Sequence, residues 1–381
     1  MPGPGGVLEL IRARGALTRG DVLDLTGLSR MTVSTRIDAL LEPGLIIERG
    51  TERVTGGRPS RRLEFNTSHA TVVAASVDTT HTTVALTDLA GRVLAEERID
   101  VAVADGPDQT LNAIADRTRA LLDATPSVQP VAAIGISVPG PVDPDTGRPS
   151  QPPIMPGWDA YPIPEHLGEA LGVPVLVAND ADAAALGEQR SAHPGSRSLC
   201  FLKVSSGIGT GIVIGGQVYR GTDGGAGDIG HVKIAGHEDA LCQCGAYGCL
   251  AAVASGRAVA AALTALGKPA ASGSDVGAYL AAGDTDAARL TQQAGRVIGE
   301  VVATVVSLLN PGEVVLGGML ASAPLLTGVR ETLYPRSLPR ATRHLTVSLS
   351  TLEHRAATVG LAALVVDREY SAAAVDAALS W

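Results

Sequence analysis

Two apolar strands joined by a short turn occur twice in this chain of 381 residues, and they constrain its fold more than any other feature. The first unit begins at residues 71–78, passes through the turn TTHTT and continues into a second predicted hairpin, VALTDLAGRVLAEERI. The second unit lies in 199–221, where the turn is rich in glycine. Strands that alternate with helical patterns predict sheets covered by helices. We therefore expect two α/β halves with mixed sheets, each opening with a strand–turn–strand unit.

The rest of the body supplies further helices and strands. Amphipathic or apolar patterns predict helices over 108–123, 288–309 and 359–369. The remaining predicted segments are a strand in 131–143, a strand, polar turn and helix in 173–188, and a strand in 311–320.

Composition limits the class of protein. Charged residues make up 18% of the chain, below the average of about 25%, and 45% of residues are hydrophobic, which excludes global disorder. No run of about 18 uncharged apolar residues predicts a membrane span. The opening MPGPGGVLEL lacks the basic and apolar regions of a signal peptide, so we expect a cytoplasmic protein.

The first 65 residues read as a helix-turn-helix. A short helix begins near Val7, and Thr18 then starts a second helix with Asp21 in a capping box. Gly27 ends that helix, and Ser29 caps a third. The predicted buried stripe of the third helix consists of Val33, Ile37, Leu40 and Leu41.

The third helix and the segment after it predict contacts to DNA. Arginine binds guanine edges and threonine contacts thymine methyls or phosphates in the major groove. Two short strands then flank a tip rich in glycine and arginine, which predicts a wing that places arginine in the minor groove. The alternative is a small helical domain that binds protein. The candidate DNA-binding residues are Arg30, Thr32, Thr35 and Arg36 on the helix, and Arg58 and Arg61 on the wing.

The net charge of residues 1–65 differs in sign from that of the remaining chain, as a DNA-binding head on an acidic body would require. Residues 1–65 hold ten arginines and eight acidic residues, a net charge of +2, and the remainder carries −11. Only the head therefore suits a polyanion, although +2 is by itself a weak signal.

Three cysteines lie in one short loop. Cys242, Cys244 and Cys249 fall in a glycine-rich segment, which lets their sulfur atoms converge. Structural zinc takes four nitrogen or sulfur ligands in a tetrahedron. His231 and His237 are the candidates for the fourth ligand, and free thiols in a loop are the alternative.

The glycine pattern around this loop resembles the ROK family of repressors, open reading frames and sugar kinases, in the actin-like ATPase and hexokinase superfamily. The resemblance covers about residues 70 to 375, and the winged head matches the repressor branch. It implies an α/β fold: an actin-like ATPase (ribonuclease H-like) two-lobed domain preceded by a winged helix-turn-helix. The residues that carry it are Gly207, Gly209, Gly211, Gly221, Gly227, Asp228, Gly230, His231, Cys242, Cys244, Gly245, Gly248 and Cys249.

The resemblance also implies a domain organisation and an assembly. We expect residues 1–65 to form the winged head, 66–188 with 358–381 the first lobe, and 189–357 the second lobe with the zinc loop. Family members form homodimers or homotetramers, and a two-fold protein matches a palindromic operator. The family pattern assigns the fourth zinc ligand to His231.

A sugar site is implied in the same way. In ROK kinases an Asn-Asp pair binds the sugar and supplies the general base, and Asn179 and Asp180 match this pair. The backbone near Gly140 would add contacts. Asp228 stands where the family has glutamate, and His231 would touch both metal and sugar. Helix capping is the alternative role for Asp180.

Two departures from the family argue against catalysis. The family's glutamate after Gly-Cys-Leu is Ala251 here, so one hydroxyl acceptor is missing. The first phosphate loop of the kinases has two glycines and a lysine, and here it reads Asp78-Thr-Thr-His81. Bulky side chains then stand where phosphate oxygens belong. The second loop, 206–211, and Gly317-Gly318 are intact. We expect weak or absent ATP binding and no catalytic residue, with Asp180 a vestigial base.

The sequence therefore predicts a sugar-responsive transcriptional regulator, a repressor that binds operator DNA and senses a carbohydrate effector in a kinase-like cleft. The rival hypothesis is an active ATP-dependent sugar kinase that carries a DNA-binding domain. A third hypothesis is a phosphorylated or non-sugar effector, since Asp228 and Ala251 change the site.

Overall fold

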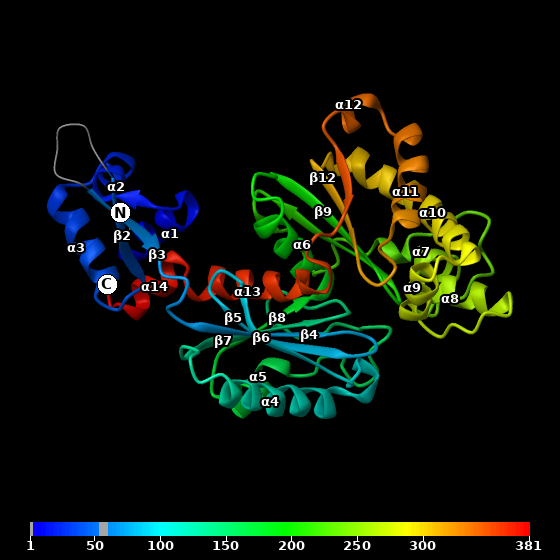
Figure 1. Cartoon of the computed structure of the whole chain (residues 1–381), viewed down its shortest axis with the longest axis horizontal. Coiled ribbons are helices and arrows are strands. Elements are labelled where there is room, and N and C mark those ends of the chain that lie inside the picture. Colours follow the sequence, from blue (N-terminus) through cyan, green and yellow to red (C-terminus); the bar gives the residue numbers. More distant parts are fainter. Residues whose placement is uncertain (1–2, 53–59) are drawn as a thin grey trace.

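The computed structural model describes residues 3–52 and 60–381, which form a small amino-terminal head beside two larger lobes (Figure 1). Three helices of the head pack on a three-stranded sheet in the order β1-β3-β2. These elements follow the order that we predicted for the head, and its assignment as a winged helix-turn-helix stays a prediction. The elements are α1 (Pro4–Arg14), β1 (Leu17–Thr18), α2 (Arg19–Thr26), α3 (Arg30–Leu41), β2 (Ile46–Glu52) and β3 (Ser60–Phe65).

The predicted helix caps of the head are present. The Thr18 hydroxyl accepts from the Asp21 amide at 3.1 Å, and the Asp21 carboxylate accepts from the Thr18 amide at 2.7 Å. Gly27 ends α2 with φ +65°, a left-handed conformation that glycine adopts without steric cost. Ser29 caps α3 by accepting from the Thr32 amide.

The predicted buried stripe of α3 needs one correction. Arg36 is 6% exposed, and its Nε and Nη1 have no hydrogen-bond partner among the described residues. Positions 33, 36, 37 and 40 are spaced by three or four residues, so Arg36 lies on the same face as Val33 and Leu40. Leu41, which we placed in the stripe, is half-buried. The expectation of an exposed Arg36 was therefore wrong.

The body contains two five-stranded sheets with the same strand order. In each, the third, second, first, fourth and fifth strands along the chain lie side by side, and the first two pairs are antiparallel. This repeated order confirms the predicted two-lobed α/β fold. Lobe I contains β4 (Thr71–Val77), β5 (Thr82–Asp88), β6 (Val93–Ile99), β7 (Val131–Val138) and β8 (Val175–Asn179), and lobe II contains β9 (Ser198–Val204), β10 (Ile208–Ile214), β11 (Gln217–Val218), β12 (Glu313–Gly317) and β13 (Thr346–Leu349).

Helices cover both faces of each sheet. On lobe I, α4 (Pro107–Ala124) and α5 (Ile163–Leu171) lie on one face and α13 (Ala356–Glu369) on the other (Figure 1). The helix α6 (Asp180–Ser191) packs between α13 and the lobe II sheet. Gly187 and Gly360 permit this contact, because a Cβ at either position would meet the backbone of the other helix. The two lobes are thus joined through the α6–α13 pair.

The far side of lobe II is mostly helical. Its core joins the sheet to α10 (Thr285–Leu309), whose 25 residues exceed the predicted 288–309. Sequence analysis did not resolve its smaller neighbours. They are α7 (Leu250–Ala254), α8 (Gly256–Ala265), α9 (Gly273–Ala281), α11 (Ala323–Arg336) and α12 (Pro339–Thr342).

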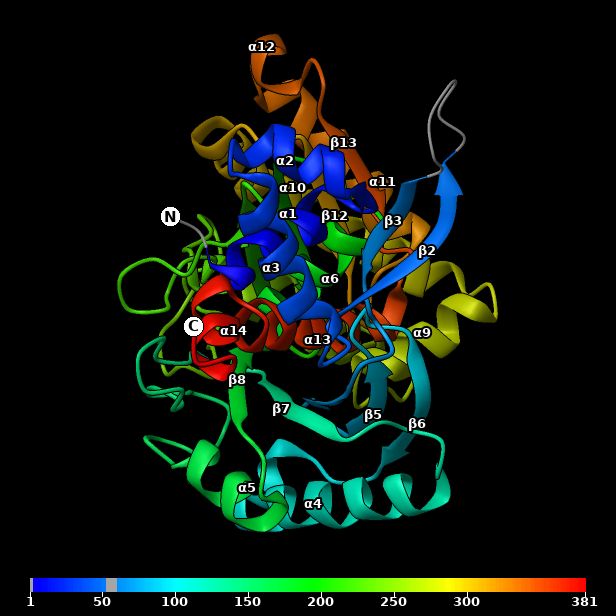
Figure 2. The ribbon, with the colours of Figure 1, turned by 90° about the vertical axis from the view of Figure 1, so that its left-hand side faces the viewer.

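The head shares a core with the carboxyl-terminal helices. Residues of α1 and α3 belong to one buried cluster with residues of α13 and α14 (Ala372–Ala378). The Gly5 amide donates to the Asp376 carboxylate at 2.7 Å. In Figure 2, α14 lies beside α1, in agreement with these contacts.

Two further expectations concern boundaries and membranes. The domain boundaries at 65/66, 188/189 and 357/358 stay predictions, although α6 continues to Ser191 across the second of them. Among residues 3–52 and 60–381, no helix combines the length and apolar character that a membrane crossing needs.

Candidate functional site

A cleft of about 520 Å³ opens between the lobes. Its lining includes all five residues that sequence analysis assigned to ligand binding, which come from the loop after β7, the end of β8, the start of α6 and the segment 228–231. The structure brings these residues together. They are Gly140, Asn179, Asp180, Asp228 and His231.

The Asn179 side chain forms hydrogen bonds both to the start of α6 and to the Gly140 loop of lobe I. Its side-chain oxygen accepts from the amides of Ala181 at 2.9 Å and Asp182 at 3.2 Å, so Asn179 is the helix cap. Its Nδ2 donates to the Gly140 carbonyl at 3.0 Å. Capping, which we considered for Asp180, therefore belongs to Asn179. Asp180 is free of that role and faces the cleft.

Lys203 is a cleft residue that sequence analysis missed. It lies near the end of β9, on the strand face that Phe201 directs toward α6. Its Nζ is 2.6 Å from an oxygen of Asp180 and 3.0 Å from an oxygen of Asp78. A lysine inside an otherwise apolar strand was the available signal, because a buried ammonium requires acidic partners.

The charges of this triad are strongly coupled. Burial would raise the pKa of Asp78, but the charge of Lys203 outweighs it and lowers that pKa to about 2. Burial raises the pKa of Asp180 despite the same ammonium. Burial alone would lower the pKa of Lys203, and the two carboxylates raise it instead, so the ammonium remains charged. The Asp180 carboxylate is therefore held in an ion pair.

In the first hairpin turn of lobe I, the side chains of Asp78 and Thr79 form hydrogen bonds within the turn and across to lobe II. The Thr79 amide donates to the Asp78 carboxylate at 2.6 Å. The Thr79 hydroxyl lies 2.8 Å from the hydroxyl of Ser206, in the corresponding turn of lobe II. Hydroxyl groups thus bridge the first hairpin turns of the two lobes.

The glycines of the second turn have structural reasons. A Cβ at Gly211 would meet the carbonyl of Ala181 and the methyl of Ala185, so this glycine lets α6 pack on the sheet. A Cβ at Gly207 would meet nothing within 4 Å, and this residue lines the cleft. The intact sequence of the second loop is therefore explained in part by packing.

A second acidic group lies behind the cleft. Asp182 is 6% exposed, and burial raises its pKa to about 7, although Arg220 is 3.9 Å away. Burial also raises the pKa of Asp228, against the opposing effect of His231. Asp180 and Asp228 line the cleft, whereas Asp182 lies outside its lining.

The predicted metal ligands form one cluster. Ligand atoms of His231, Cys242, Cys244 and Cys249 all lie within 4.8 Å of one another. The Cys242 sulfur is 3.8 Å from Nδ1 of His231, and the Cys244 and Cys249 sulfurs are 3.8 Å apart. Donors about 2.1–2.3 Å from a tetrahedral metal are separated by roughly 3.5–3.8 Å. The four residues could therefore hold a metal ion, and the cluster contains His231 rather than His237.

Short backbone bonds shape this loop. The Cys242 amide donates to the Ala246 carbonyl at 2.8 Å, and the Gly245 amide donates to the Cys242 carbonyl at 3.0 Å. Gly245 has φ +83° and Gly248 has φ +72°, which other residues adopt with difficulty. The glycines thus let three sulfurs converge within eight residues of chain.

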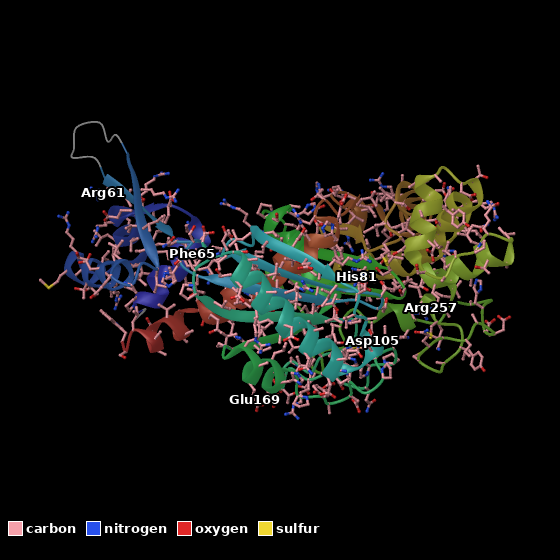
Figure 3. The ribbon with its side chains drawn as sticks, turned by 60° about the horizontal axis from the view of Figure 1, so that its bottom comes forward. Arg61, Phe65, His81, Asp105, Glu169 and Arg257 are labelled. Carbon is pink, nitrogen blue, oxygen red and sulfur yellow. The ribbon has the colours of Figure 1, made fainter. Side chains whose placement is uncertain are left out.

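The candidate nucleic-acid surface is partly as predicted. Arg30 and Thr35 are exposed near the start of α3, while Thr32 is half-buried and its hydroxyl lies 2.8 Å from that of Ser29. Arg61 is exposed on β3, pairs with Glu48 at 3.0 Å and is labelled in Figure 3. Arg58 lies outside the described residues. Arg36 is buried, as reported above.

One apolar residue on this surface was also missed. Met31, the second residue of α3, is 81% exposed and stands next to Arg30. An exposed methionine costs solvation free energy unless a partner covers it, and a methionine can contact the methyl group of thymine.

Comparisons with known proteins agree with this architecture. The family model described as "ROK family" matches residues 72–368. A putative xylose repressor of Caldicellulosiruptor sp. (strain Rt8B.4) is 29% identical over 378 residues, which cover 94% of each chain. The crystal structure of a ROK family transcriptional regulator, a homolog of the E. coli MLC protein, is 27% identical, covers 99% of this chain and 98% of its own, and superposes with a TM-score of 0.82.

A kinase of known structure matches a smaller share of the chain. The ROK hexokinase from Thermus thermophilus is 32% identical, with a TM-score of 0.62, over 77% of this chain and 97% of its own. The regulator therefore covers nearly the whole chain, head included, whereas the hexokinase leaves about a quarter of it unmatched. With a family model matching well over half of its length, and with the cleft and cysteine loop in place, this chain belongs to the ROK family.

Proposed function

We propose that this protein is a sugar-responsive transcriptional repressor with a kinase-like sensing cleft. The observation that carries the proposal is the state of Asp180: this carboxylate, which the family resemblance assigns as the general base, pairs with Lys203 at 2.6 Å, and a Thr79–Ser206 hydroxyl contact bridges the two hairpin turns. A relative named as a xylose repressor and a regulator that covers the head support the same conclusion.

The head would bind operator DNA. Its major-groove contacts are Arg30, Thr35 and Met31, with Thr32 placed to contact the backbone near the helix start. Arg61 would approach the duplex from the wing, together with Arg58, and release Glu48 to do so. A homodimer or homotetramer would present two heads to the two halves of a palindromic site.

The cleft would bind a carbohydrate through the residues that line it. Asn179, Asp228 and His231 would bind hydroxyl groups, and Gly140 would contribute backbone contacts. A ligand that binds the closed lobes more tightly than the open lobes shifts the population toward closure.

Closure would reach the head through the α6–α13 pair. Arg190, in the last turn of α6, donates to Asp367 of α13 at 2.8 Å. The other oxygen of Asp367 accepts from Arg12 of α1 at 2.7 Å, and Arg12 also donates to the Tyr370 carbonyl at 3.0 Å. One carboxylate thus connects the helix that begins at the cleft to the first helix of the head.

The cysteine loop would hold a structural zinc ion. His231, Cys242, Cys244 and Cys249 supply the four donors, and the bound ion would cross-link the loop and offset the charge of the thiolates. Because His231 also lines the cleft, the metal fixes one wall of the effector site.

Two assays on the full chain test this function. Gel-shift titration with a palindromic operator should show tight binding that a carbohydrate weakens, and a coupled assay with ATP, Mg²⁺ and a panel of hexoses and N-acetylated amino sugars should show no steady ADP release. The rival function, a sugar kinase with a DNA-binding head, is favoured by the retained Asp180. Sustained ADP release that depends on the sugar would establish that rival and overturn the proposal.

A further inference from the structure

The helix α3 of the head contains a buried charge without a bonding partner in the described part of the chain. Arg36 is 6% exposed, and its Nε and Nη1 are buried with no hydrogen-bond acceptor among residues 3–52 and 60–381. A guanidinium is positively charged in proteins and can only donate hydrogen bonds. Its burial is costly when its bonds to water are lost and not replaced. The position of Arg36 therefore destabilises the head in the absence of a partner.

The acidic side chains nearest to α3 are bound to other cations. Asp38, on α3 itself, pairs with Arg19 at 3.1 Å. Glu48, on the strand β2 that packs against α3, pairs with Arg19 at 3.4 Å and with Arg61 at 3.0 Å. The acidic residues of α1 and α2, and the one that follows α3, are exposed; they are Glu9, Asp21, Asp24 and Glu42. Within the described residues, Arg36 thus forms no ion pair with a carboxylate.

Helix geometry directs the Arg36 side chain toward the amino end of α3. Its neighbours one turn before and after it are Thr32 and Ala39, both half-buried, so Arg36 lies at the edge of the buried stripe. Side chains of a helix lean toward its N-terminus, and an extended Arg36 therefore reaches the turn that contains Thr32. The helix α3 lies on the side of the head away from the two lobes (Figure 1). A rotation of the side chain brings its charge to the surface that we assign to DNA.

Turning Arg36 outward would break no hydrogen bond that the structure describes. The methylene groups of a long basic side chain can stay packed on apolar neighbours while the charged end extends outward. A phosphate oxygen would supply the missing acceptor, through a charge-assisted hydrogen bond that is stronger than one between neutral groups. DNA would therefore replace a buried charge without a partner by a paired one.

We infer that Arg36 binds a phosphate of the DNA backbone, and that this side chain is folded into the head without DNA and turns outward when a duplex binds. The inference rests on the proposed function and adds a contact that the DNA-free structure conceals. Because phosphate contacts carry no base information, Arg36 adds affinity for any duplex. The same residue lowers the stability of the protein when DNA is absent.

The variant Arg36→Met tests both effects, because methionine keeps an apolar chain and removes the charge. Fluorescence anisotropy measures binding of the full chain to a duplex that the unmodified protein selects from a random-sequence pool, at several salt concentrations. We expect affinity to fall at least about 10-fold, the lower bound for a hydrogen bond to a charged group. The slope of log affinity against log salt concentration should decrease in magnitude by about 0.9, which corresponds to one phosphate contact. Without DNA, the melting temperature should rise by about 2 °C.

Three further variants separate charge from packing. Arg36→Lys keeps the charge and should retain the salt slope. Leu40→Met changes packing on the same buried face and should leave the salt slope unchanged. Arg340→Met removes an exposed arginine of α12, outside the head, and should change neither the salt slope nor the melting temperature.

The outcomes separate the phosphate contact from the proposed function. If Arg36→Met binds the selected duplex with the affinity and salt slope of the unmodified protein, the phosphate contact is overturned and DNA binding stands. If Arg36→Met melts at a lower temperature or does not fold, or if its affinity falls at an unchanged salt slope, Arg36 has only a structural role and the inference is overturned. If the unmodified protein selects no duplex from the pool, the proposed DNA binding is overturned together with the inference.

Discussion

The first hairpins of the two lobes have the same place in the same strand order and different chemistry. In lobe I the turn from Asp78 to His81 contains two threonines, and the Thr79 hydroxyl occupies the space between the lobes. In lobe II the turn from Ser205 to Gly207 is open beside Gly207, and its neighbour Gly211 is required for packing against α6. The fold therefore requires the hairpins themselves, while glycines in the turn are a separate property, which the turn of lobe I lacks.

The same comparison extends to the groups that each lobe contributes to the cleft. Lobe I supplies carboxylates, Asp78 and Asp180. Lobe II supplies the cations Lys203 and Arg257, the metal cluster and the Asp228 carboxyl group. The Lys203 ammonium pairs with both carboxylates of lobe I, which ties the two lobes together. Substitutions in one lobe or the other therefore test how the two lobes differ.

Removal of a metal ligand should give the largest effect and confine it to lobe II. Cys244→Ser should lower bound metal from one ion per chain to none and reduce the stability of lobe II by about 4 kcal/mol or more. Elemental analysis and hydrogen exchange measure both quantities, with loss of protection around His231–Leu250 and none in β4–β8. Cys200→Ala, in the buried strand β9, is the control that should keep the metal. Unaltered operator release by sugar in Cys244→Ser would remove the metal from the mechanism.

Loss of the central cation should be nearly as costly. Lys203→Met leaves two buried carboxyl groups without their partner and should lower the free energy of unfolding by about 3–5 kcal/mol. The combined variant Asp78→Asn, Asp180→Asn, Lys203→Met removes all three charges and should recover most of that loss. Denaturant unfolding measures each change. A single variant within about 1 kcal/mol of the unmodified protein would contradict the assignment of Lys203 as the link between the lobes.

Asp182 should make stability depend on pH in a defined direction. Its pKa in the folded protein, about 7, is above the ordinary range, so between about pH 4 and 7 the folded state holds a proton that the unfolded state releases. Its stabilising contribution is therefore complete at low pH and is lost as the pH rises through 7, by at most about 1.4 kcal/mol per pH unit. Relative to the unmodified protein, Asp182→Asn should gain stability from pH 5 to 7.5. A constant difference across that range would refute the assignment.

Making the two turns alike should have the smallest effect. Thr79→Gly with Thr80→Gly gives lobe I two glycines and removes the hydroxyl bridge, which costs about 1 kcal/mol. Nucleotide affinity should change by less than 10-fold, because Lys203 still holds Asp78 and Asp180. Titration with AMP-PNP measures the change. Strong nucleotide binding by this variant would show that the threonines alone separate the protein from the kinases.

The elements with strong local signals were predicted from sequence. The Thr18–Asp21 capping box, the turn at Gly27 and the hairpin through Asp88–Gly91 each depend on residues close together in the chain, and each was found. The metal loop was equally local, since its glycines and cysteines lie within eight residues. Its His231 was selected by the resemblance, and the structure places it in the cluster.

Features that depend on tertiary contacts were not predicted. Lys203 was treated as part of an apolar strand, because its partners Asp78 and Asp180 come from another lobe. Arg36 was expected on the surface because arginine is usually exposed, whereas helix periodicity places it beside Val33. Arg257 carries no sequence signal at all: only the approach of α8 to the second turn brings it to the cleft.

The shared core of α1 and α14 has a consequence for how such regulators can be recombined. The head is built together with α13 and α14, since Gly5 bonds to Asp376 and Arg12 bonds to Asp367 and Tyr370. A chimera that exchanges only the first 65 residues would keep the original α14, whose contacts with the new α1 would no longer be complementary. Swapping operator preference between relatives therefore calls for transplanting the last helix together with the first three.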